Sequence, residues 1–188
     1  MSGLPITMAG MNRVGLLIFV AVVFSSTFAG LCWSAENEPA ELGVRVGAGE
    51  ASESKEFHLY EVQGSIPLPW ALEWPDSQGL LGVRANAALG MMRTGGDSGV
   101  YVYLGPALRF GRQKWWVEAG TAPTVIAEDR IGGEDLGGPF QITSHLGVGY
   151  RFTDRWSTGF RIQHMSNADI YTRNPGLDYG TLEVNYRY

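Results

Sequence analysis

The 188-residue sequence has little cysteine and little net charge. Cys32 is the single cysteine, so no disulfide can form within the chain. Lysine and arginine number 14 against 19 aspartates and glutamates, which leaves a net charge of -5 and no basic excess suited to nucleic acid. Both a disulfide-stapled scaffold and a nucleic-acid-binding protein are therefore disfavoured.

Long apolar runs are confined to the first 35 residues. Arg13 is the only charge there, and the apolar stretch 14–29 ends in small residues, as a secretory signal does. We predict a signal peptide over residues 1–35, cleaved near Ala35, with a retained membrane helix as the alternative. Residues 36–188 contain no apolar run of the about 18 residues that a transmembrane helix needs. If they cross a membrane, they must do so as a closed β-barrel.

Glycine and aromatic residues are plentiful, at 26 residues and 12%, a composition that suits strands, tight turns and aromatic girdles. Apolar and polar residues alternate with a period of two along eight segments, and arginines recur on the polar side. The predicted strands are 41–49, 57–66, 80–92, 99–110, 114–126, 140–152, 155–167 and 179–188. Eight strands of this length are enough for a small transmembrane barrel.

The end of the chain supports the same fold. Leu182, Val184, Tyr186 and Tyr188 alternate with polar residues, and a terminal aromatic of this kind resembles the assembly signal of bacterial outer-membrane barrels. We therefore predict an all-β protein, an eight-stranded antiparallel transmembrane barrel integral to the bacterial outer membrane, formed by residues 36–188. A soluble eight-stranded barrel is the alternative, because alternation alone does not distinguish the two.

The connections can be sorted by length, since short turns of such barrels face the periplasm and long loops face outside. With both termini periplasmic, the tight turn at 153–154 sends segment 155–167 outward. The outer loops are then 50–56, 93–98, 127–138 and 168–178. We expect the acidic stretch 132–135 to be a solvated loop.

His164 and Ser166 lie near the outer end of segment 155–167, on the same face as apolar residues such as Phe160 and Ile162. Residues i and i+2 of a strand project from one face, about 6 to 7 Å apart. A serine becomes a good nucleophile when an imidazole takes its proton, and the imidazole needs an acceptor of its own. The pair is thus a candidate nucleophile and base on a lipid-facing surface. An ordinary polar pair at the rim is the alternative.

The run HMSNA at 164–168, followed by NPGLD at 174–178 and a terminal strand, resembles the outer-membrane lipid A 3-O-deacylases of the PagL type. The resemblance implies an eight-stranded barrel whose outer surface carries a Ser-His-Glu triad that hydrolyses an acyl ester of lipid A. It assigns Ser166 as the nucleophile and His164 as the base. The acid falls on Asp178, where the family usually has glutamate, and Asp169 is the competing candidate.

The resemblance also points to the donors that would stabilise an oxyanion, namely the amide of Asn174 and backbone N–H groups just after Ser166. Asn167 has two readings, because an asparagine there can also order the end of the strand. His58 and His145 lack carboxylate or cysteine partners at metal-ligand spacing, so we predict no metal site. The hydrolysis implied by the resemblance requires no cofactor.

The expected function is a serine esterase that releases the 3-O-linked primary acyl chain of lipid A in lipopolysaccharide. Lipid A and the surrounding outer-membrane lipid are then its partners, and nothing in the sequence indicates an oligomer. An outer-membrane phospholipase is one alternative, since that family also uses a His-x-Ser-Asn run, although on a larger barrel. A non-enzymatic structural or adhesive small barrel is the other.

Overall fold

The computed structural model describes residues 38–51, 55–74 and 79–188 of the chain. The predicted signal peptide, residues 1–35, lies outside the described residues. No helix formed by the described residues is long and apolar enough to cross a membrane.

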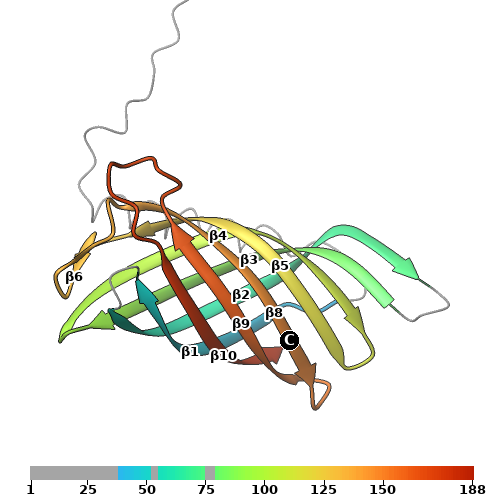
Figure 1. Ribbon diagram of the computed structural model, residues 1–188. Helices are drawn as coiled ribbons and strands as arrows, with labels where there is room; N and C mark the ends of the chain where they lie inside the picture. Colours follow the sequence, from blue (N-terminus) through green and yellow to red (C-terminus); the bar gives the residue numbers. More distant parts are fainter. Residues whose placement is uncertain (1–37, 52–54, 75–78) are drawn as a thin grey trace, which may run out of the picture.

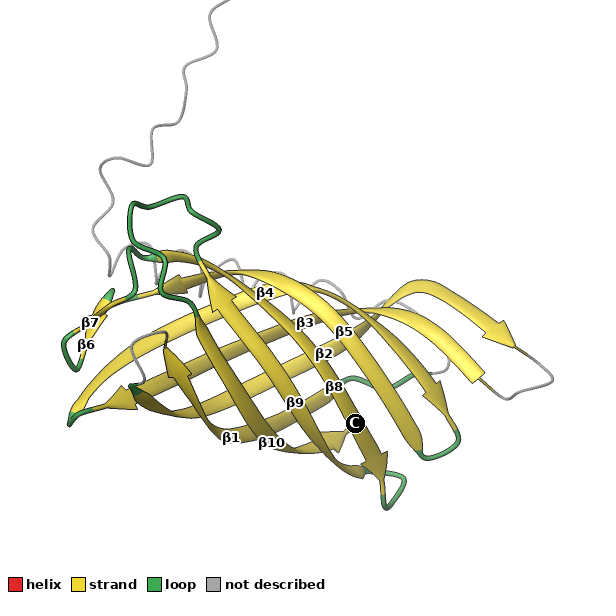
Figure 2. Ribbon diagram, in the orientation of Figure 1, coloured by secondary structure: helices red, strands yellow, loops and turns green. Residues whose placement is uncertain are grey.

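Eight antiparallel strands close into a barrel, as Figures 1 and 2 show. They are β1 (Glu41–Ala51), β2 (Glu56–Trp74), β3 (Gly79–Thr94), β4 (Asp97–Arg112), β5 (Trp115–Ile126), β8 (Phe140–Arg151), β9 (Trp156–Ser166) and β10 (Leu177–Arg187). Around the barrel their order is β1-β10-β9-β8-β5-β4-β3-β2, so the last strand pairs with the first. The prediction of an all-β, eight-stranded antiparallel barrel is confirmed.

The outer face of the barrel is apolar, and the inner face carries the charges. Large apolar side chains such as Leu182 and Val44 are exposed by 61% and 55% on the outside. Inside, Arg45 is buried and donates hydrogen bonds to Glu61 and Glu183 at 2.6 and 2.7 Å. A soluble barrel would place its apolar residues inside, so this inverted pattern favours a barrel that faces lipid.

The barrel interior changes from charged to apolar toward the loops that follow β5 and β9. Apolar side chains from several strands form a buried cluster there, which includes Met92, Ile126, Met165 and Leu177. Two short strands, β6 (Arg130–Ile131) and β7 (Glu134–Asp135), form a hairpin within the segment predicted as a loop. Ile131 of this hairpin is 1% exposed and joins the apolar cluster. The hairpin therefore packs onto the end of the barrel interior.

The expectation that the acidic stretch is solvated is wrong for Glu134, whose side chain is fully buried. Its carboxylate lies 3.9 Å from Lys55 Nζ and 3.7 Å from Arg173 Nη2. These cations come from two other loop regions, which sequence spacing does not connect to the acidic stretch. The buried carboxylate thus helps to hold three connections together at one end of the barrel.

Strand β2 also runs farther than the predicted end at residue 66. Proline has no backbone N–H, so Pro67 and Pro69 argue against a continuing ladder. The pairing of β2 with β3 nevertheless resumes at Ala71 after a register shift that begins at Pro67. Pro67 is the last paired residue before this bulge, and Pro69 lies within it, outside the regular ladder. The β2–β3 hairpin consequently extends past its neighbours (Figure 1).

Candidate active site

His164 occupies the centre of a short row of outward side chains. The pairing register places Asp178 of β10 opposite it on one side and Ser144 of β8 on the other. The side chains of His164 and Asp178 are exposed by 53% and 81%, so both lie on the outer surface of the barrel. The alternation along β9 explains why His164 points outward, because its two neighbours in the strand, Gln163 and Met165, are buried.

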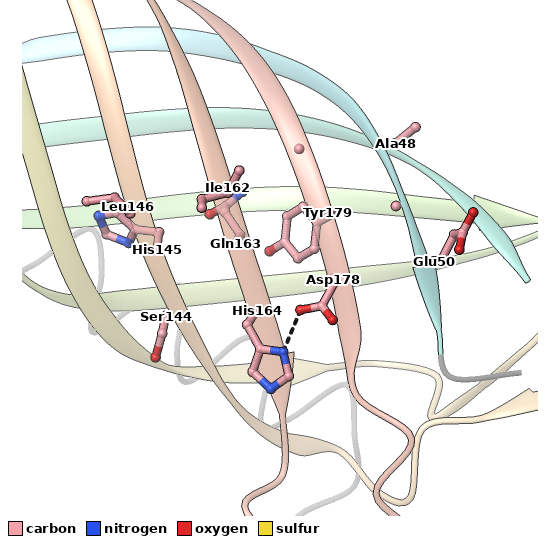
Figure 3. Close-up of a pocket in the computed structure, with 12 residues that line it drawn as sticks. Ala48, Glu50, Ser144, His145, Leu146, Ile162, Gln163, His164, Asp178 and Tyr179 are labelled. Atoms are coloured by element: carbon pink, nitrogen blue, oxygen red, sulfur yellow. Dashed lines mark hydrogen bonds and ion pairs between the residues drawn. The ribbon is translucent and has the colours of Figure 1, made fainter. Parts of the chain in front are cut away.

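His164 Nδ1 and Asp178 Oδ1 are 2.7 Å apart, a close hydrogen bond (Figure 3). An ionised carboxylate can only accept, so the imidazole carries its proton on Nδ1. The lone pair of Nε2 is then available to take a proton from a nucleophile. Cβ atoms of register partners lie about 4.5 to 5.5 Å apart. This direct pairing explains how Asp178 reaches the ring although its side chain is one methylene shorter than glutamate.

Ser166 is the last residue of β9 and projects from the same face as His164. It is half-buried, and its register partner on β8 is Ile142. Among the described contacts, the His164 side chain is hydrogen-bonded to Asp178 and not to Ser166. Hydrogen bonds between a nucleophile and its base often tighten only when substrate is bound. The structure thus brings His164 and Asp178 into contact and leaves Ser166 as their neighbour along the strand.

Asp169, the competing acid, bonds to the loop instead of the histidine. Its Oδ1 accepts a hydrogen bond from Asn174 Nδ2 at 3.0 Å. Asn174 Oδ1 in turn accepts the backbone N–H of Asn167 at 3.1 Å. Two of the predicted oxyanion donors, the Asn174 amide and the N–H after Ser166, are therefore linked to each other. The Asn174 amide group keeps one further N–H to donate.

The side chain of Asn167 is fully buried. Its Nδ2 donates to the backbone oxygens of Leu136 and Arg173 at 3.3 and 2.8 Å. These carbonyls belong to the connections after β5 and after β9, so the side chain joins the two loops. The contacts favour the ordering role of this side chain over a role in oxyanion binding.

Gly176 lies just before β10 and allows the chain to pass close to the ring of His164. Its φ of +69° is in the left-handed region that glycine adopts readily. A Cβ at this position would lie 3.3 Å from His164 Cε1. Glycine therefore supplies both the turn before β10 and the space beside the imidazole.

A groove of about 650 Å³ opens on the outer surface beside the pair (Figure 3). His164 and Asp178 line one end, together with Ser144. Glu50 lies beside them, and the next row of outward residues in the lining is apolar or glycine. This row includes Leu146, Ile162, Gly180 and Ala48, of which the last two are register partners. The groove is therefore polar at the catalytic candidates and apolar away from them, as an ester with a hydrocarbon chain would require.

The other two histidines also have carboxylate partners, contrary to the expectation from the sequence. Glu56 lies two residues before His58 on the same strand face, so this pairing could have been predicted, whereas Glu118 is far from His145 in the sequence. His58 Nε2 lies 3.6 Å from Glu56 on the outer surface, and His145 Nε2 lies 3.2 Å from Glu118 inside the barrel. In the part of the chain that the structure describes, no three His, Cys, Asp or Glu side chains are grouped so that they could hold a metal ion.

Ser144 was not singled out from the sequence. Its position opposite His164 depends on the pairing of β8 with β9, which no local pattern specifies. Its hydroxyl lies 3.2 Å from that of Thr121 on β5. The sequence signal that could have identified this residue is that Ser144 and Thr121 each place a hydroxyl on a strand face that is otherwise apolar.

Comparison with known proteins gives a consistent result. Residues 58–187 match the family described as lipid A 3-O-deacylase (PagL). A lipid A deacylase PagL of Bordetella bronchiseptica is 29% identical over 170 residues, which cover 86% of this chain and 92% of that protein. The corresponding protein of Pseudomonas aeruginosa is 29% identical over 83 residues, which cover 44% and 45% of the two chains.

A solved structure shares the fold. The crystal structure of the outer membrane enzyme PagL superposes with a TM-score of 0.62 at 22% identity, over 78% of this chain and 99% of that one. The matched family region includes all of β8, β9 and β10, and with them His164, Ser166 and Asp178. The chain belongs to the lipid A 3-O-deacylase (PagL) family.

Proposed function

We propose that this chain is a serine esterase of the bacterial outer membrane that hydrolyses the 3-O-linked primary acyl chain of lipid A. Ser166 is the nucleophile, His164 the general base and Asp178 the acid that orients it. One observation carries the assignment of roles: the outward hydrogen bond of His164 to Asp178, with a serine two residues along the same strand face. Family membership supports the reaction and the substrate.

The first half of the reaction transfers the acyl group to the enzyme. Ser166 Oγ attacks the ester carbonyl carbon while its proton passes to His164 Nε2. Asp178 stabilises the imidazolium that forms. When the tetrahedral intermediate collapses, the bond from the acyl carbon to the sugar oxygen breaks, and His164 returns the proton to that oxygen. The products of this half are the deacylated lipid and an acyl ester on Ser166.

Water completes the cycle by the same route. His164 takes a proton from a water molecule, whose oxygen attacks the acyl-enzyme carbonyl. The bond to Ser166 Oγ breaks, the serine recovers its proton from His164, and a free fatty acid leaves. The residues alone supply the acid–base chemistry of both halves.

The position of the site suits a substrate that stays in a membrane. The outer surface around β9 is apolar, with Phe160 and Ile162 exposed by 46% and 52%. A lipid can therefore approach sideways from the bilayer without leaving it. The groove beside His164 offers apolar floor residues for the hydrocarbon and polar residues for the ester.

Mass spectrometry of lipid A tests this proposal. The wild-type chain and Ser166→Ala are produced at equal levels in the outer membrane of a host whose lipid A retains its 3-O-linked chain. Wild-type cells should yield lipid A lighter by one acyl chain, and the variant should leave it unchanged. Intact lipid A together with fatty acid released from phospholipid would contradict the proposal and favour a phospholipase.

A further inference from the structure

Polar side chains form a continuous row across the outer surface at the level of His164. Successive register pairs join Thr121, Ser144, His164, Asp178 and Glu50, one residue from each of β5, β8, β9, β10 and β1. The neighbouring row, toward the centre of the strands, contains only apolar residues and glycine. Its members are Ala119, Leu146, Ile162, Gly180 and Ala48. The row of polar residues is therefore set apart from the surface next to it.

The two sides of His164 differ in charge along this row. On the β10 side lie the carboxylates of Asp178 and Glu50, which are register partners. On the β8 side lie two neutral hydroxyls, those of Ser144 and Thr121. Negative charge that develops next to His164 is repelled by the carboxylates and can be stabilised by hydroxyl donors. The side of β8 is thus the favourable side for an oxyanion.

The hydroxyl pair can supply such a donor. Each hydroxyl has one hydrogen and can accept as well as donate. When Thr121 donates to Ser144 across their 3.2 Å contact, the hydrogen of Ser144 is free for another acceptor. Ser144 lines the groove beside His164, so that hydrogen can reach a molecule bound there (Figure 3).

The spacing to the nucleophile is compatible with this role. Ser166 pairs with Ile142, so Ser144 is its diagonal neighbour on β8. Diagonal neighbours lie about 7 to 8 Å apart at Cα, within reach of side chains that point toward each other. A path from the attacking oxygen through the carbonyl carbon to its oxygen and on to a donor spans about 5 Å. An ester bonded to Ser166 Oγ can therefore direct its oxygen at Ser144.

The loop engages part of the donors expected there, so a further donor would add to the one that stays free. The N–H of Asn167 is bonded to Asn174 Oδ1, and one N–H of Asn174 Nδ2 is bonded to Asp169, which leaves the second N–H of Asn174 Nδ2 to donate. We propose that Ser144, oriented by Thr121, donates a hydrogen bond to the oxygen of the scissile carbonyl as Ser166 attacks. Ser144 is then a catalytic residue and Thr121 a positioning residue. This inference rests on the proposed function.

The test is steady-state kinetics of purified full-length variants in detergent micelles with purified lipid A. Loss of one oxyanion donor lowers kcat by about 10²-fold to 10³-fold. We expect Ser144→Ala to show a loss of this size with KM changed by less than about twofold, because the bond forms in the transition state. Ser144→Thr keeps the hydroxyl and should recover most of the rate. Thr121→Val should lower kcat by less than Ser144→Ala.

Thr158→Val is the matched control. Thr158 is an exposed hydroxyl on the same face of β9, outside the row, and donates to the backbone oxygen of Glu183. Its removal should leave kcat and KM unchanged. Equal heat-modifiability on gels confirms that each variant has formed the barrel.

The outcomes separate the two proposals. If the wild-type chain turns over lipid A and the kcat of Ser144→Ala is within about twofold of the wild-type value, the role of Ser144 is overturned and the proposed function stays intact. Lipid A left whole by the wild-type chain would overturn both. Labelling with a serine-reactive fluorophosphonate and mapping of the adduct should place it on Ser166. An adduct on Ser144 would overturn the donor role and make that residue the nucleophile.

Discussion

Two histidine–carboxylate pairs lie on opposite faces of the same sheet. His145 on β8 points into the barrel, 3.2 Å from Glu118, and the two side chains are exposed by 3% and 0%. His164 on the adjacent strand points outward, 2.7 Å from Asp178. The chemical groups are similar, so contact between an imidazole and a carboxylate does not by itself mark an active site.

The partners of each carboxylate explain the difference. Glu118 also accepts hydrogen bonds from Arg109, Arg161 and Asn86, so it is the centre of a buried network. Asp178 lies on the surface of the barrel, where its side chain is hydrogen-bonded to His164 and a groove opens beside it. The inner pair therefore belongs to the buried interior of the barrel, whereas the outer pair is open to the surface and lies on the same strand face as Ser166.

The largest expected effect is on the outer face. Ser166→Ala or His164→Ala should each lower kcat by about 10⁴-fold or more, because the nucleophile or its base is lost. The barrel should still assemble, since neither side chain fills the interior. Turnover is measured with purified protein and lipid A in micelles, and assembly by heat-modifiability. Ester release at the wild-type rate by either folded variant would disprove the assignment.

The second largest effect is expected at Asp178, the proposed acid of the triad. Asp178→Asn should lower turnover by roughly 10³-fold to 10⁴-fold, because an amide cannot stabilise the imidazolium as a carboxylate does. Asp178→Glu should retain part of the activity, and Asp169→Asn, whose carboxylate bonds to Asn174, should be mild. All three are assayed side by side. A dead Asp169→Asn with an active Asp178→Asn would reverse the assignment, and activity in both would mean that another group orients the histidine.

The inner pair should respond in stability and not in catalysis. Glu118→Gln removes the charge that Arg109 and Arg161 share, and breaking a buried ion pair costs about 3 to 5 kcal/mol. His145→Gln, which keeps the arginine contacts of Glu118, should cost less. The readout is the urea midpoint of unfolding in detergent, with kcat of the folded fraction as the control. A loss of kcat without a loss of stability would make the inner pair part of the active site.

The smallest effect concerns the terminal aromatic. Tyr188 packs edge-on against Tyr186, which in turn contacts Trp156, and these rings lie at the end of the barrel opposite the active site. Tyr188→Asp should lower the amount of heat-modifiable barrel a few-fold, since a ring suited to the membrane interface is lost. The assembled fraction should keep its turnover. Unchanged assembly would count against a role of the terminal strand in this process.

Much of the fold was predictable because alternation is a local property. Each predicted strand overlaps an observed one, and inward arginines such as Arg45 and Arg161 follow from the same parity. The exceptions are segments where tertiary contacts override local preference. The ladder of β2 continues past Pro67, and burial of Glu134 depends on cations from distant loops.

The candidate site was predictable only in part. His164 and Ser166 share a face on any strand register, so their proximity follows from the sequence alone. The contact of His164 with Asp178 and the place of Ser144 depend on how β8, β9 and β10 align. That alignment is set by closure of the whole barrel, which the composition of a single segment does not encode.

Asp178 belongs to β10, the last strand in chain order, so its position affects when the site is completed during assembly. Ser166 and His164 are on one strand, but the carboxylate reaches His164 only when β10 has paired with β9. In the proposed triad, the base is therefore oriented only after the last strand has paired with β9. Because β10 is the last strand in chain order, we expect the proposed enzyme to become active late in its assembly.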